Sequence, residues 1–164
     1  MLVFFVGYIE TRKKIWGEKL AKELNYDFVD TRDLIADKAG TTYGDLLKNK
    51  ELYIKLEQEV LEDVLKLENT VIATSELLPG RADNMDILNN AGKTVFLRAG
   101  LGCIMMRVSK LKNEIPLLSG IDPDIVPDFI SMELKRRNPV YAKAQFNKLS
   151  RELKMKELLE FINL

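Results

Sequence analysis

Short apolar runs alternate with amphipathic segments along this chain. An apolar run at residues 2–6 passes through Gly7 into residues 15–24, where apolar side chains recur at helical spacing, and this pattern predicts a strand, a loop and a helix. Further strands are predicted at 26–30, 70–74, 94–97 and, at a sheet edge, 145–149, and further helices at 33–38, 45–47, 51–67, 83–90, 101–112, 124–137 and 150–161. The run at 70–74 is short, apolar and β-branched, as expected of a central strand buried in a parallel sheet. Strands that alternate with helices in this way predict a doubly wound, parallel α/β sheet.

Single residues set several of the predicted element ends. Asparagine or glycine is expected to close three of the helices, at Asn25, Gly40 and Gly92. The helix that begins at residue 124 is expected to stop before Asn138-Pro139, because proline disfavours helical backbone at the residue preceding it. Ser150 is expected to begin the final helix. Proline and glycine interrupt residues 113–123, so we expect an irregular segment that could serve as a lid.

Composition narrows the possible functions. At 164 residues the chain is expected to form one domain over residues 1–164. It has 25 basic and 25 acidic residues, so we expect neither nucleic acid nor a membrane as a partner. The absence of histidine excludes histidine chemistry, and a single cysteine, Cys103, suits a reducing compartment. The run at 2–6 is too short to span a bilayer and lacks the features of a signal peptide, so we expect a cytoplasmic protein, and a monomer.

The first loop of the predicted sheet partly matches a phosphate-binding loop. Ligands of parallel α/β sheets lie at the carboxyl ends of the strands, where this loop begins. In the motif G-x-x-x-x-G-K-[ST], backbone N–H groups and the lysine hold phosphates, and the hydroxyl holds magnesium. The corresponding residues here read GYIETRKK. Gly7 and Lys13 are in place, but Arg12 replaces the second glycine and Lys14 replaces the hydroxyl.

Three longer stretches agree with the pattern of a known family. They are GYIETRKKIWGEKLAKELNYDFVD, NMDILNNAGKTVFL and PLLSG, and Arg137 followed by Pro139 and Tyr141 adds a fourth match. With these matches the chain resembles the shikimate kinases over nearly its whole length. The resemblance implies a three-layer α/β/α P-loop kinase fold with a five-stranded parallel sheet, a substrate-binding helical region at about 31–62 and a lid at about 111–123. It also implies ATP and magnesium as cofactors for phosphorylating a hydroxyl of shikimate.

Several site positions nevertheless differ from the family's pattern. Glu10 and Arg12 stand in place of glycines, Lys14 in place of Ser or Thr, Arg32 in place of an acidic residue, Ile54 and Ile115 in place of arginines, and Ser75-Glu76-Leu77 in place of three glycines. Side chains at glycine positions obstruct a loop that needs left-handed backbone, and a lysine in place of the hydroxyl repels the metal. Lys13, Asp30 and Arg137 are the polar site residues that remain.

These departures favour a pseudoenzyme with a binding or regulatory role, so we expect no bound metal and no cofactor. The residues that could still act are Lys13 and Asp30 as vestigial catalytic groups, Gly7, Arg12, Lys13 and Lys14 as nucleotide or anion contacts, and Arg137 as a substrate contact. The partner, a protein or a small molecule, is not identified by the sequence.

Two other functions stay open. One is an active or altered small-molecule kinase that converts ATP and shikimate to ADP and 3-phosphoshikimate, with Lys13 on the phosphates, Asp30 for metal or base work and Arg137 on a carboxylate. The other is a sensor of a small anion. The same residues also have purely structural interpretations, in which the loop cations are solvated and partly neutralised by Glu10, Asp30 pairs with Lys13 or Arg32, and Arg137 forms a local salt bridge.

Overall fold

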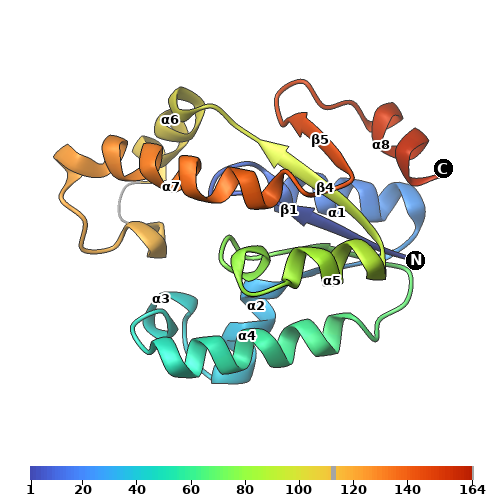
Figure 1. The fold of residues 1–164 in the computed structure, drawn as a ribbon, viewed down its shortest axis with the longest axis horizontal. Coiled ribbons are helices and arrows are strands. Elements are labelled where there is room, and N and C mark those ends of the chain that lie inside the picture. The colour runs from blue at the N-terminus through green and yellow to red at the C-terminus, as the bar shows by residue number, and fades with distance from the viewer. Residues whose placement is uncertain (112–113, 164) are drawn as a thin grey trace.

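A five-stranded, wholly parallel sheet forms the middle of the molecule in the computed structural model, which describes residues 1–111 and 114–163 (Figure 1). The strands are β1 (Leu2–Val6), β2 (Asp27–Asp30), β3 (Thr70–Ala73), β4 (Lys93–Arg98) and β5 (Phe146–Leu149). Their order in the sheet is β2-β3-β1-β4-β5. All four neighbouring pairs are parallel, so the loops after the strands emerge at one edge of the sheet.

Helices cover both faces of this sheet. They are α1 (Lys13–Leu24), α2 (Thr31–Ala39), α3 (Tyr43–Leu46), α4 (Lys50–Val64), α5 (Asn84–Ala91), α6 (Leu101–Leu111), α7 (Val126–Tyr141) and α8 (Met155–Ile162). Single turns of 3-10 helix lie at η1 (Leu78–Gly80), η3 (Pro116–Leu118) and η4 (Pro123–Ile125). None of the helices in the described ranges is long and apolar enough to cross a membrane.

Alternating side chains of β1 fill two cores. Phe4 and Val6 pack with side chains of α4, α5, α6 and α7, whereas Val3 and Phe5 pack with those of α1 and α8. Every residue of β1 is buried, because this strand has helices on both faces and a strand on each side. The predicted three-layer α/β/α sheet of the P-loop kinase fold is therefore confirmed. The strand predicted to be central, β3, is interior but lies between β2 and β1, and β1 holds the centre.

Helix α7 continues past the position where the sequence predicts its end. Pro139 lies in the last turn of this helix, which closes where the N–H of Ala142 donates to the carbonyl of Asn138 at 2.8 Å. Tyr141 is fully buried, and its hydroxyl donates to the carbonyl of Glu76 at 2.6 Å. The predicted stop before Asn138 is wrong because this anchored final turn outweighs the local preference created by the proline.

Ser150 does not begin the final helix. Its backbone N–H donates to the carbonyl of Arg98 at 2.8 Å and so extends the pairing of β5 with β4. Helix α8 begins at Met155, where the carboxylate of Glu157 accepts the backbone N–H of Lys154 at 3.1 Å. Serine is a common first residue of a helix, but the backbone N–H of Ser150 is hydrogen-bonded to β4 and this residue therefore belongs to the end of the sheet.

The segment between α6 and α7 is partly regular. Its described part contains the turns η3 and η4, so the expectation of a wholly irregular segment is wrong there. The predicted helix end at Lys112 and the predicted segment start at Asn113 lie outside the described residues. The lid, like the substrate-binding region at about 31–62, stays a prediction.

Candidate functional site

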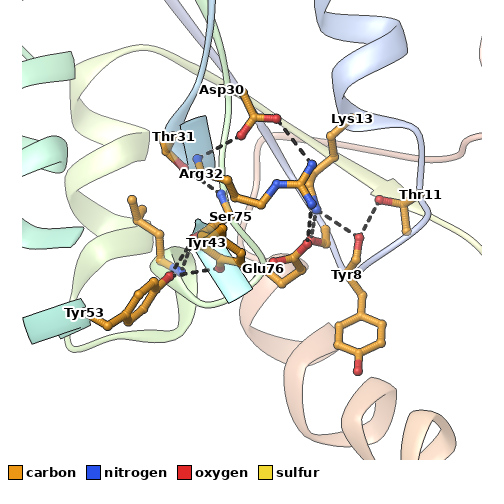
Figure 2. Close-up of polar contacts among 12 residues, drawn as sticks. Tyr8, Thr11, Lys13, Asp30, Thr31, Arg32, Tyr43, Tyr53, Ser75 and Glu76 are labelled. Carbon is orange, nitrogen blue, oxygen red and sulfur yellow. Dashed lines mark hydrogen bonds and ion pairs between the residues drawn. The ribbon is translucent and has the colours of Figure 1, made fainter. Parts of the chain in front are cut away.

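The loop between β1 and α1 is closed around the side chain of Lys13. The ammonium Nζ donates to the carbonyls of Gly7 at 2.5 Å and Tyr8 at 2.9 Å, and the hydroxyl of Thr11 donates to the same Tyr8 carbonyl at 2.9 Å (Figure 2). Gly7 has φ of +149°, and a Cβ there would lie 2.5 Å from the carbonyl oxygen of Leu97. Only glycine fits where the end of β4 approaches the loop so closely.

Two residues of the loop hold left-handed backbone although they carry side chains. Glu10 has φ of 54° and Arg12 has φ of 67°. This conformation costs a residue other than glycine about 1 kcal/mol or more. The guanidinium of Arg107 in α6 donates to the carbonyl of Glu10, which fixes the loop from a second helix. The loop therefore keeps backbone angles suited to glycine at positions where the glycines are gone.

The cations of the loop have different environments. Lys13 is buried, and this desolvation lowers its pKa to about 8, although the nearby carboxylates of Glu76 and Asp30 oppose the shift. Lys14 is exposed, and its Nζ lies 3.9 Å from a carboxylate oxygen of Asp33. In the described part of the chain no ion pair joins Glu10 to a cation, although the charge of its carboxylate also raises the pKa of Lys13, so Glu10 acts on the loop only through space.

Arg32 joins two buried carboxylates at the ends of β2 and β3. Its NH2 lies 3.3 Å from Oδ2 of Asp30, and its NH1 lies 3.3 Å from Oε1 of Glu76 (Figure 2). The other oxygen of Asp30, Oδ1, accepts the backbone N–H of Arg32 at 2.9 Å and caps α2. Burial lowers the pKa of Arg32, but ion pairing with Glu76 and Asp30 outweighs it and raises that pKa. Of the two structural interpretations of Asp30, the structure shows the pair with Arg32.

Aromatic hydroxyls crowd the space on the far side of Glu76. The hydroxyl of Tyr53 donates to Oε2 of Glu57 at 2.5 Å. The hydroxyl oxygen of Tyr43 lies 3.2 Å from the hydroxyl oxygen of Tyr53. Burial raises the pKa of both tyrosines, so both hydroxyls stay protonated. The cavity left among Arg32, Tyr43 and Glu76 measures about 110 Å³. That is well below the roughly 300–1,000 Å³ typical of small-molecule sites.

The structure brings most of the predicted site residues together. Arg12, Lys13, Lys14 and Asp30 line one cavity of about 160 Å³, next to Gly7. Arg137 does not line it: its Nε donates to Oε2 of Glu133 at 2.6 Å, and it borders a different cavity.

Sequence reasoning missed the role of Glu76. The signal was present, because position 32 gained a positive charge and position 76 gained a negative one relative to the family's pattern. Opposite changes at the ends of two strands indicate a contact between them. Here the contact joins residues 44 positions apart.

A parallel sheet of this order, with a closed loop between its central strand and first helix, defines an α/β protein of the P-loop kinase type. The sequence model described as shikimate kinase matches residues 12–162. The shikimate kinase of Bacteroides thetaiotaomicron is 34% identical over 146 residues, which cover 88% of this chain and 83% of that protein. That of Bacteroides fragilis is 32% identical over 146 residues, covering 88% and 82%. The chain belongs to the shikimate kinase family, which confirms the resemblance.

Solved structures agree with this assignment. The crystal structure of the Bacteroides thetaiotaomicron shikimate kinase superposes with a TM-score of 0.91 at 31% identity, covering 100% of this chain and 99% of that one. A shikimate kinase from Acinetobacter baumannii in complex with shikimate superposes with a TM-score of 0.85 at 25% identity, covering 99% and 92%.

Proposed function

We propose that this chain is a ligand-binding member of the shikimate kinase family that no longer transfers a phosphoryl group from ATP to shikimate. The observation that carries the proposal is the ion pair between Arg32 and Glu76. The two residues stand where the family's pattern has a carboxylate and a glycine, and they bind each other. An internal salt bridge therefore takes the polar groups that a hydroxylated substrate would need.

The residues at the loop do not fit a magnesium ion. Both carboxylate oxygens of Asp30 accept hydrogen bonds from Arg32, and Lys14 replaces the hydroxyl that the motif supplies to the metal. Magnesium requires oxygen ligands in near-octahedral geometry, and a neighbouring ammonium and guanidinium oppose its charge. The residues present therefore do not suit the metal that accompanies ATP in phosphoryl transfer.

The loop keeps features that suit a small anion. Lys13, which lines the cavity of about 160 Å³, uses two of its three donors on loop carbonyls and so keeps one donor for a ligand. Arg12 and Lys14 line the same cavity. We propose a phosphate-sized anion as the loop's ligand, in a cytoplasmic monomer that signals to a protein or small-molecule partner.

Family membership supports a second candidate, an active or altered kinase. In this case Lys13 would contact the phosphates of ATP, Asp30 would serve the metal or act as a base, and Arg137 would bind the carboxylate of shikimate. The products would be ADP and 3-phosphoshikimate. The names of the relatives favour this candidate, whereas the contacts of Arg32, Glu76 and Lys14 favour the first.

A coupled ADP-release assay with Mg-ATP and shikimate separates the two candidates. The Bacteroides thetaiotaomicron relative serves as the positive control, and Lys13→Ala of this chain serves as the blank. We expect the wild-type chain to match the blank, and calorimetry to show no binding of Mg-ATP or shikimate. Turnover that Lys13→Ala abolishes would refute the loss of activity and establish the kinase.

A further inference from the structure

Residues 115–118, which we call the 115–118 turn, contain η3 and lie beside α3 (Figure 1). Ile115 is 7% exposed and Leu118 is 9% exposed. Both side chains belong to the apolar core that also holds Ile9 of the phosphate loop and Leu46 of α3. The 115–118 turn is therefore packed into the core, whereas most connecting segments run over the surface of a protein.

The 115–118 turn leaves little room at the carboxyl ends of β2 and β3. Ile115 and Pro116 line the cavity of about 110 Å³ together with Arg32 and Glu76. That cavity shares Arg32, Glu76 and Glu10 with the cavity of the phosphate loop, so the two are neighbours. A ligand that extends from the loop toward α3 therefore needs the 115–118 turn to move away.

Apolar contacts hold the 115–118 turn in place. A Cβ on Gly44 of α3 would lie 3.6 Å from Cβ of Pro116, which is an ordinary van der Waals distance. The backbone N–H of Leu118 donates to the carbonyl of Ile115 at 3.0 Å, and that of Ser119 donates to the carbonyl of Pro116 at 3.1 Å. One such turn is too short to be stable by itself in water, so it depends on the burial of its side chains.

The residue at position 115 decides whether this packing is favourable. Isoleucine gains free energy when its side chain leaves water. The family's pattern has an arginine at this position, and a buried guanidinium needs a counterion and further hydrogen-bond acceptors. Ile115 thus replaces a side chain that favours water with one that favours the core.

We propose that the 115–118 turn is closed in the free protein, with Ile115 as its anchor, so that the cavity at Arg32 and Glu76 is shut without any ligand. The contact is autoinhibitory, because the turn occupies space that a bound organic molecule would need. The proposal does not depend on whether the phosphate loop binds an anion, and its tests use no ligand.

Hydrogen exchange of the ligand-free chain tests the closure. The backbone N–H groups of Leu118 and Ser119 are bonded within the turn, so their protection reports whether the turn stays packed. We expect exchange over residues 117–119 to be at least about tenfold slower than in an unstructured peptide. Ile115→Ser should speed it about tenfold or more, whereas Ile115→Val keeps most of the apolar side chain and should have a smaller effect.

Ile125→Ser is the matched control, because Ile125 is 53% exposed and lies outside the 115–118 turn. It should leave exchange over residues 117–119 unchanged to within about twofold. Unprotected N–H groups in the wild type, or exchange that Ile115→Ser leaves unchanged, would overturn the proposal. Should Ile115→Ser fail to fold, as judged by its unfolding transition, the following measurement decides.

An engineered disulfide tests the same contact independently. In a chain that carries Cys103→Ser, the pair Gly44→Cys and Pro116→Cys places two Cβ atoms about 3.6 Å apart, within the range of about 3.5–4.5 Å that a disulfide needs. The pair should close in a glutathione buffer at least about tenfold faster than the control pair Gly102→Cys and Pro116→Cys. A Cβ on Gly102 has no neighbour within 4 Å. Equal rates for the two pairs would show an open turn and refute the closure.

Discussion

The guanidinium of Arg32 lies 3.3 Å from the carboxylate of Glu76 and links the loop after β2 to the loop after β3. Glu76 is 2% exposed, whereas Arg32 is 37% exposed, so the pair spans the boundary between the core and the cavity. Loss of one partner from a buried pair is costly because the other charge then has no counterion. Arg32 and Glu76, which both differ from the family's pattern, therefore stabilise the fold only as a pair.

A double-mutant cycle should show this dependence. Arg32→Met leaves Glu76 buried beside Asp30, and Glu76→Gln leaves Arg32 with Asp30 alone, so each single variant loses stability. The double variant should be more stable than the sum predicts, by about 1–3 kcal/mol. Urea unfolding of the four proteins measures the coupling. Additivity to within about 0.5 kcal/mol would show that the contact contributes no stability.

Glycine at the two strained loop positions should stabilise the protein. Glu10→Gly and Arg12→Gly each remove a side chain from left-handed backbone, for an expected gain of about 1 kcal/mol in the free energy of unfolding. The same change in regular helix should have the opposite sign, and Glu18→Gly in α1 is the matched control, with an expected loss of about 1 kcal/mol. A loss at all three positions would contradict the strain.

Adding Lys14→Thr to the two loop changes should recover nucleotide binding if the remaining pocket is sound.

Lys13 should make stability depend on pH in alkaline solution. Its pKa falls from 10.5 to about 8 on folding, so between these values the unfolded chain binds the proton that the folded chain has released. Stability must then rise with pH across this window, because the unfolded state holds more protons. The difference between the wild type and Lys13→Met should follow that rise in urea titrations at several pH values. Lys22→Met, on the exposed side of α1, is the matched control, and an equal response in both variants would refute the assignment.

Gly17 should not tolerate a side chain. A Cβ there would lie 2.5 Å from Cε2 of Phe28, so Gly17→Ala should cost about 1–3 kcal/mol through overpacking of α1 against β2. Phe28→Leu, which shortens the ring, should restore part of that loss when combined with it. Gly102→Ala in α6 has no neighbour within 4 Å and should instead gain up to about 1 kcal/mol. Thermal unfolding of the variants tests the contrast, which vanishes if α1 can shift away from β2.

Local patterns were sufficient to predict the strands and most helices. Runs such as TVIA are β-branched and buried, so their secondary structure is determined within a few residues. Pro139 and Ser150 were misjudged because distant groups, the carbonyls of Glu76 and Arg98, decide their backbone. Local propensity describes a proline or a serine by its own backbone preference. In the fold, hydrogen bonds to distant residues outweigh that preference.

The candidate site was predictable in position but not in its interactions. The carboxyl ends of parallel strands bring Lys13 and Asp30 together, as the pattern indicates. The pairings of Arg32 with Glu76 and of Arg81 with Glu57 join residues 44 and 24 positions apart. No local periodicity contains such pairs, because only the packing of separate elements decides which side chains meet.

The retained backbone of the loop bears on how readily its chemistry could change in evolution. Two side chains occupy left-handed positions, yet the loop still closes around Lys13. Its shape is therefore imposed by Gly7, the strand before it and the helix after it, and glycines at positions 10 and 12 are not needed to form it. Single codon changes at these positions would alter the lining of the cavity without first requiring a new main-chain path, so gain and loss of ligands here can proceed one residue at a time.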